Sequence, residues 1–231
     1  MTMDTEEEWQ HCNSETFWRE VAPRAHVVQL YESEEGLLNL LEDFAAGGVT
    51  AGDAVIVIAT GEHLEALGER LGNYGLDIDS LRASGQYLPL DVGQIMAGFM
   101  VGGWPDERLF VEAVTGIFDR VRGGGWHVRA FGEMVALLWA RGSRDATVRL
   151  EHLWNAFSER EAFSLFCAYP REVFCEDAAG ALSSICGAHS RMISNAGEQR
   201  FDLTYRDVQQ AWHMEVNSPD TEVPGLCHRR Q

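Results

Sequence analysis

The sequence feature that most constrains the fold is a regular alternation of short apolar segments with longer amphipathic ones. One apolar segment, Ala54–Ala59, reads AVIVIA, a continuous run typical of a strand buried on both faces of a parallel sheet. Because parallel strands need crossover connections, the alternation predicts an α/β protein, a three-layer α/β/α sandwich with a mainly parallel sheet of five strands or more. The predicted strands are residues 26–31, 54–59, 87–90, 128–131 and 163–168.

Capping residues set the expected limits of the helices between these strands. Ser33, followed by two acids, predicts the start of the first helix, and Gly47 with Gly48 predicts its end. After the last strand, Asp177 predicts the start of a helix that extends to Ile193. One more helix is predicted at residues 205–216.

The length of 231 residues suits one large domain with extensions at its ends. Residues 1–24 are predicted to form an acidic N-terminal extension, residues 25–196 the domain, and residues 197–231 a C-terminal extension. A hydrophobic content of 45% is sufficient for a sizeable core.

Charge and cysteine content exclude several functions and indicate a compartment. The net charge of −18 opposes contact with phosphate backbones, so no direct binding of nucleic acid is expected. Five cysteines, an odd number without a CxxC pair, indicate free thiols in a reducing, cytoplasmic setting. The apolar runs are too short to span a bilayer, so no membrane attachment is expected.

Motifs for phosphate binding and for hydrolysis are missing. The first predicted strand leads into YESEEG, where a nucleotide-binding protein of this topology carries GxxxxGK[ST]. That segment has no lysine, and its acids would repel phosphate. GxGxxG and GxSxG are also absent, which leaves neither a dinucleotide site nor a nucleophile elbow.

Polar and aromatic residues at the carboxyl ends of the predicted strands form the candidate binding site. Ligands of open α/β sheets bind at this edge, and aromatic walls with a few polar groups suit a small, weakly polar molecule. Glu133 could act there as a general base, could cap the following helix, or could bond the loop of a neighbouring strand. The predicted ligand-binding residues are Tyr31, Thr60, Glu133, Trp139, Tyr169 and Arg171.

A metal site and a catalytic site receive no support from residue spacing. His63, Glu133 and His189, or Cys167 with Cys186, could meet in the fold, but their spacings match no familiar ligand pattern. Buried histidines and cysteines usually pack and form hydrogen bonds. We therefore expect no metal, no cofactor and no enzymatic activity.

Four ordered blocks of the sequence resemble the MEDS domain, a sensory domain named for methanogens, methylotrophs and the dichloromethane-responsive regulator. The blocks begin at His26 (HVVQLYESEEGLLNLL), Val128 (VRAFGEMVALLWARG), Arg149 (RLEHLWNAFSEREAFSLFCAYP) and Ile185 (ICGAHSRMI). The resemblance implies a RecA-like topology with a degenerate P-loop, and the sensing of small hydrocarbon derivatives in prokaryotic signalling. The family's recurrent positions fall on His26, Tyr31, Glu133, Trp139, Tyr169 and His189.

The resemblance also implies how a signal would leave the domain. Many relatives carry a histidine kinase, PAS or DNA-binding region, whereas only a short tail follows Ile193 here. We therefore expect a stand-alone sensory module that acts through a signalling partner, such as a histidine kinase or transcription regulator, or through a homodimer. Two alternatives stay open: a ligand-free interaction module regulating a kinase or an anti-sigma system, and an enzyme using Glu133.

Overall fold

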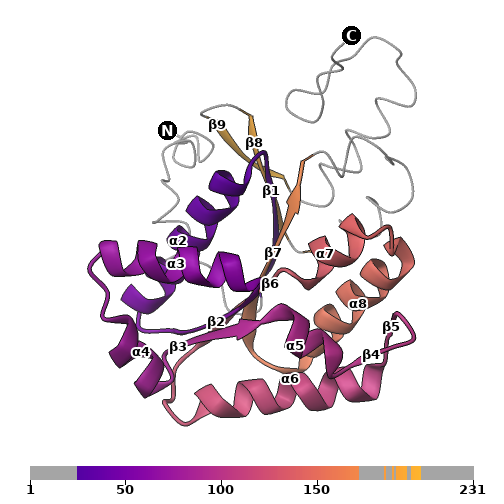
Figure 1. Cartoon of the computed structure of the whole chain (residues 1–231), viewed down its shortest axis with the longest axis horizontal. Helices are drawn as coiled ribbons and strands as arrows, with labels where there is room; N and C mark the ends of the chain where they lie inside the picture. Colours follow the sequence, from indigo (N-terminus) through magenta and orange to yellow (C-terminus); the bar gives the residue numbers. More distant parts are fainter. Residues whose placement is uncertain (1–24, 172–184, 186–188, 190, 197–198, 204–231) are drawn as a thin grey trace, which may run out of the picture.

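The computed structural model describes residues 25–171, 185, 189, 191–196 and 199–203 and contains a central seven-stranded sheet (Figure 1). The strand order is β3-β2-β6-β7-β1-β8-β9; all neighbours pair in parallel except β8 and β9, which are antiparallel. The predicted mainly parallel sheet is thereby confirmed. The strands are β1 (His26–Tyr31), β2 (Ala54–Ala59), β3 (Tyr87–Asp91), β6 (Val128–Gly132), β7 (Phe163–Pro170), β8 (Arg191–Ala196) and β9 (Gln199–Leu203).

Helices cover both faces of the sheet and complete the three layers (Figure 1). On one face lie α2 (Glu34–Thr50), α3 (Gly61–Asn73) and α4 (Ile78–Ser84). On the other lie α5 (Val92–Ala97), α6 (Glu107–Arg122), α7 (Met134–Ala140) and α8 (Arg144–Arg160). A short hairpin of β4 (Met100–Val101) and β5 (Trp104–Pro105) precedes α6.

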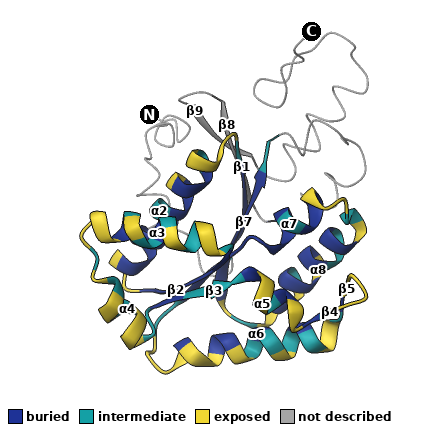
Figure 2. Ribbon diagram, in the orientation of Figure 1, coloured by how far each residue is buried: buried dark blue, intermediate teal, exposed yellow. Residues whose placement is uncertain are grey.

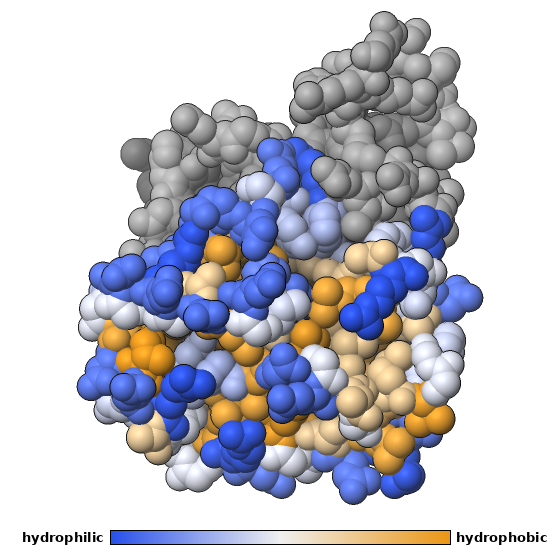
Figure 3. All heavy atoms as spheres, in the orientation of Figure 1, coloured by the Kyte–Doolittle hydropathy of each residue, from blue (hydrophilic) through white to orange (hydrophobic). Residues whose placement is uncertain are grey.

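Strands β1, β2, β6 and β7 are almost entirely buried between the helical layers (Figure 2). All six residues of β2 are buried, as its continuous apolar run predicts. Aromatic side chains dominate the layer around α6 and α8, where Trp154 packs edge-on against Phe110 at a centroid distance of 5.1 Å. Hydrophilic side chains gather on the outer surface over α2 and α3 (Figure 3). No described helix has both the length and the apolar character that crossing a bilayer requires.

One ion pair is buried at the amino end of the sheet. Arg129 in β6 is 2% exposed, and its Nε donates a hydrogen bond to Oδ2 of Asp53, which directly precedes β2. His127 Nδ1 lies 3.6 Å from the same carboxylate oxygen. The pair therefore ties β2 to β6 at the edge opposite the strand ends that hold the predicted site.

The predicted end of the first helix at Gly47 and Gly48 is wrong, because α2 continues to Thr50. A glycine can continue a helix when close packing leaves no room for a side chain. A Cβ placed on Gly48 would lie 2.6 Å from Val55 Cγ2 and 3.2 Å from Arg129 Cδ. Gly48 therefore lets α2 approach the sheet and the buried ion pair. The chain turns only at Gly52, where φ is 83°.

Replacing Gly48 with alanine is expected to lower the free energy of unfolding by about 1–3 kcal/mol, because overpacking outweighs the better helix propensity. Gly116 in α6 is the matched control, since a Cβ there meets nothing within 4 Å. Gly116→Ala is expected to raise stability by up to about 1 kcal/mol. Urea unfolding of both variants checks the contrast, and stabilisation by Gly48→Ala would contradict the close approach.

The C-terminal part of the domain differs from the prediction. Ile193 lies in β8, not in a helix, and β8 extends the sheet beside β1. Strand β9 follows the predicted boundary at residue 196 and pairs with β8. Helix α4 was also not predicted. The extension 1–24, the helix start at Asp177, Cys186 and the helix predicted at 205–216 lie outside the described residues.

Candidate functional site

Glu133, between β6 and α7, joins two neighbouring strand ends. Its Oε2 accepts a hydrogen bond from the backbone N–H of Thr60 at 2.9 Å, and its backbone N–H donates to Ile58 O at 2.9 Å. Its Oε1 lies 2.9 Å from Nδ1 of His63 in α3. The carboxylate is 5% exposed and makes no capping bond to α7. Of the three roles considered for Glu133, the contacts fit a bond to the loop of the neighbouring strand.

Tyr31, at the end of β1, belongs to the same group. Burial, with smaller contributions from Glu133 and Glu34, raises the pKa of Tyr31 to about 12. The phenol is therefore neutral at physiological pH and can donate a hydrogen bond. We call Tyr31, Thr60, His63 and Glu133 the strand-end group.

The carboxylate of Glu133, 2.9 Å from Nδ1 of His63, raises the pKa of His63 above its ordinary value, and this outweighs the opposing effect of burial. Because the folded pKa is raised, the contribution of His63 to stability is complete below the unfolded pKa of about 6.5 and is lost as pH rises through the folded value. The stability difference between the parent protein and His63→Gln is therefore expected to shrink from pH 5.5 to pH 9. Urea unfolding at several pH values measures this difference.

The same comparison in a Glu133→Gln background provides the control. Without the carboxylate partner of His63, the pH dependence of the difference is expected to weaken strongly. A difference that is independent of pH in the parent protein would show that the pair of His63 and Glu133 is not formed in solution.

Arg171 follows β7 and lies beside the end of β1. Its guanidinium pairs with Glu32, and its backbone N–H donates to Tyr31 O at 2.7 Å. These two contacts hold the residue that follows β7 against the end of β1, next to Tyr31.

The two remaining predicted residues form a different group. Trp139 and Tyr169 pack edge-on at a centroid distance of 6.4 Å in the layer of α7 and α8. The Tyr169 hydroxyl donates to Oε1 of Glu151 in α8 at 2.5 Å. The predicted site residues are thus divided between the strand-end group and a buried polar region under α8.

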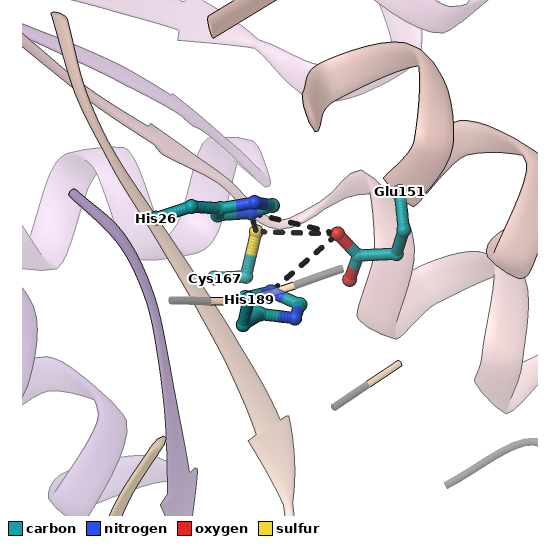
Figure 4. Close-up of side chains that lie close together, drawn as sticks. All are labelled: His26, Glu151, Cys167 and His189. Carbon is teal, nitrogen blue, oxygen red and sulfur yellow. Dashed lines mark hydrogen bonds and ion pairs between the residues drawn. The ribbon is translucent and has the colours of Figure 1, made fainter. Parts of the chain in front are cut away.

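Four side chains meet in that region, and we call His26, Glu151, Cys167 and His189 the buried cluster (Figure 4). His26 Nε2 lies 3.5 Å from Cys167 Sγ and 3.6 Å from Glu151 Oε2. His189 Nε2 lies 3.5 Å from the same carboxylate oxygen, and Cys167 Sγ lies 3.9 Å from it. The four come from β1, α8, β7 and the chain just before β8.

The buried cluster lies in a dry environment. Glu151 is fully buried, and desolvation raises its pKa, although His189, Tyr169 and Cys167 favour the ionised form. Burial, followed by the charge of Glu151, raises the pKa of Cys167 well above its ordinary value. His189 Nδ1 lies 2.6 Å from Ile185 O, which leaves Nε2 directed toward Glu151.

Residue patterns pointed to parts of this cluster but not to the whole. His26 and His189 were expected as family positions, and Cys167 was considered in a different combination. Glu151 was missed because its neighbours on α8 repeat at ordinary helical spacing. A usable signal is His26 itself: it shares one face of β1 with Val28 and Leu30, and Val28 is in register with Cys167.

Comparison with known proteins agrees with this architecture. A family model described as the methanogen/methylotroph, DcmR sensory domain (MEDS) matches residues 25–189. Among solved structures, a KaiC-like protein from Pyrococcus horikoshii is similar with a TM-score of 0.51 at 12% identity, and 79% of each chain is covered. At that identity the likeness concerns the fold alone, and it confirms the RecA-like α/β class. No curated protein matches the chain.

Proposed function

The chain belongs to the MEDS family of sensory domains, and from that membership we propose that it is a non-catalytic module that binds a small organic molecule and signals through a protein partner. The observation that carries the proposal is the strand-end group. Glu133 and Tyr31 lie at the ends of β6 and β1, which are not neighbours, at the edge where open α/β sheets bind their ligands, and the charge of Glu133 contributes to the raised pKa of Tyr31.

The chemistry of this edge favours a small neutral molecule. A neutral phenol and a histidine can each hydrogen-bond a polar tip, while Glu133 with Glu34 opposes an anion such as phosphate. A molecule with one polar group on a short hydrocarbon frame fits these demands. That class agrees with the hydrocarbon derivatives that family membership suggests.

Helices α2, α3 and α7 begin next to the strand-end group, which provides a route for the signal. Thr60 is the N-cap of α3, Glu133 precedes α7, and Tyr31 lies just before α2. A ligand that replaces a contact of Glu133 would change how α3 is held against β6. A partner protein bound to these helices, such as a histidine kinase or a transcription regulator, would sense that change.

One observation favours a second candidate, a ligand-free interaction module. Both oxygens of Glu133 already have partners within the chain, Thr60 and His63, so the carboxylate could serve only to hold the fold together. In that case no small molecule would stabilise the protein.

Ligand-induced thermal stabilisation separates the two candidates. Dichloromethane and a graded series of short-chain alcohols that begins with methanol are titrated while the unfolding midpoint is recorded. A ligand at 100 times its Kd adds about 2.7 kcal/mol, which for a chain of this size corresponds to a rise of about 5–10 °C. The Glu133→Gln variant is expected to stay folded and to lose most of that rise.

Glu112→Gln is the matched control, because Glu112 is exposed and pairs with Arg108 on its own helix. It is expected to respond to the ligand as the parent protein does. If no compound raises the midpoint of the parent protein, the ligand-free module is favoured. An equal rise in Glu133→Gln would place binding elsewhere in the protein.

A further inference from the structure

The buried cluster has the donor atoms of a transition-metal site. His26, His189, Cys167 and Glu151 offer two imidazole nitrogens, one sulfur and one carboxylate oxygen, all within 4.8 Å of one another. All four residues are buried, and the side chains of Glu151 and His189 are 1% exposed. Nitrogen and sulfur donors suit Zn²⁺, whereas Mg²⁺ and Ca²⁺ prefer shells of oxygen.

Four of the six spacings among these donor atoms are close to the edges of a tetrahedron. Zinc bonds to nitrogen, oxygen and sulfur require edges of about 3.4 Å between nitrogen or oxygen donors and about 3.6 Å to sulfur. The observed distances from Glu151 Oε2 are 3.6 Å to His26 Nε2, 3.5 Å to His189 Nε2 and 3.9 Å to Cys167 Sγ. The distance from His26 Nε2 to Cys167 Sγ is 3.5 Å.

His189 also has a polar atom that the protein does not satisfy. Its Nδ1 is 2.6 Å from Ile185 O, a contact that requires a proton on Nδ1 and makes Nε2 of the neutral ring an acceptor. That Nε2 is buried, forms no hydrogen bond within the described part of the chain, and faces an acceptor oxygen of Glu151 at 3.5 Å. A cation between the two lone pairs would satisfy both atoms.

Two neighbouring groups, the Ile185 carbonyl and the Tyr169 hydroxyl, orient His189 and Glu151 in the way that residues around a metal site usually orient the ligands. A histidine that binds a metal commonly donates its other ring N–H to a backbone carbonyl, as Ile185 O allows for His189. The Tyr169 hydroxyl holds Oε1 of Glu151, which leaves Oε2 directed at the other three donors (Figure 4).

We propose that His26, Glu151, Cys167 and His189 bind one Zn²⁺ ion in a closed, four-coordinate site that fastens the chain before β8 to β1, β7 and α8. The ring centroids of His26 and His189 are 3.9 Å apart, and two imidazoles on one tetrahedral ion are about 5 Å apart. Binding therefore moves these rings apart. Because four protein donors complete the shell, the ion is structural and the site is separate from the strand-end group.

Metal content and cobalt substitution test the site in the full-length chain. Elemental analysis of purified protein is expected to find about one Zn²⁺ per chain, as a closed site of four protein donors requires. After removal of metal, one equivalent of Co²⁺ is expected to give the intense visible bands of tetrahedral cobalt and a thiolate charge-transfer band. A folded parent protein that neither retains Zn²⁺ nor binds Co²⁺ stoichiometrically would overturn the proposal.

Variants assign the ligands. Cys167→Ser is expected to abolish the charge-transfer band. His189→Gln is expected to weaken Zn²⁺ binding more than about 100-fold, which exceeds the usual effect of losing a residue that only orients a metal ligand. His152→Gln changes an exposed histidine on α8 and is expected to bind as the parent protein does. Unchanged Zn²⁺ affinity and an unchanged cobalt spectrum in the first two variants would also overturn the proposal.

The metal test is independent of the proposed ligand site. Glu133→Gln is expected to keep its metal while losing the response to small molecules. A parent protein without metal would contradict the zinc site alone, and a parent protein that no small molecule stabilises would contradict the ligand site alone.

Discussion

Replacing Asp53 with alanine is expected to lower the free energy of unfolding by about 3–5 kcal/mol, because it leaves the buried charge of Arg129 without its carboxylate. The guanidinium stays protonated at any accessible pH, so it cannot avoid the cost by losing its proton. Arg129 is 2% exposed, which limits its access to water. Urea unfolding at neutral pH measures the loss.

The double variant Asp53→Ala with Arg129→Met provides the control, because it removes both charges and keeps an unbranched side chain beside Gly48. It is expected to be clearly more stable than Asp53→Ala alone. A loss below about 1 kcal/mol for Asp53→Ala, or no recovery in the double variant, would show that the ion pair does not contribute in this way.

Replacing Trp154 with alanine is expected to cost about 3–5 kcal/mol, since it opens a cavity in the aromatic layer between α8, α6 and the sheet. Trp154 is 1% exposed, and its ring meets Phe110 at 5.1 Å and Phe163 at 6.4 Å. Phe110 and Phe163 are held by the backbone of two different elements, α6 and β7, so they can close only part of the cavity. Thermal and urea unfolding measure the effect.

Trp104→Ala is the matched control for that truncation. Trp104 is 48% exposed in the β4–β5 hairpin, and its removal is expected to cost less than about 1 kcal/mol. Equal losses for the two tryptophans would contradict the assignment of the aromatic layer as the main core on that face.

Five of the seven strands of the sheet could be predicted because each of them carries its own signal, whereas β8 and β9 were not predicted. The run AVIVIA marks β2 as a central strand without reference to any other part of the chain, and the cap at Ser33 marks the start of α2. Such local signals fix the order and type of the elements. The end of α2 could not be predicted from local patterns. Gly48 continues the helix because a side chain there would collide with Val55 in β2, and no local pattern records that tertiary contact.

The candidate sites could be predicted only in part for the same reason. Strand ends identify Thr60 and Glu133 as neighbours once a parallel sheet is assumed, and a direct contact joins them. Tyr169 was predicted to join Glu133, but its hydroxyl bonds Glu151. The face of β7 that Tyr169 occupies, and the helix that covers this face, determine that contact. That choice depends on how α8 packs, and helix packing is a tertiary property.

Chemical-shift mapping of backbone amides tests the central claim most directly. The ¹⁵N-labelled full-length chain is titrated with the compound that gives the largest thermal stabilisation. We expect the largest shifts at the amides of Thr60, His63 and Glu133, with little change at Asp53 on the opposite edge of the sheet. Shifts centred on Asp53 and Arg129, or around the buried cluster with none at Thr60, would contradict a ligand site at the strand-end group.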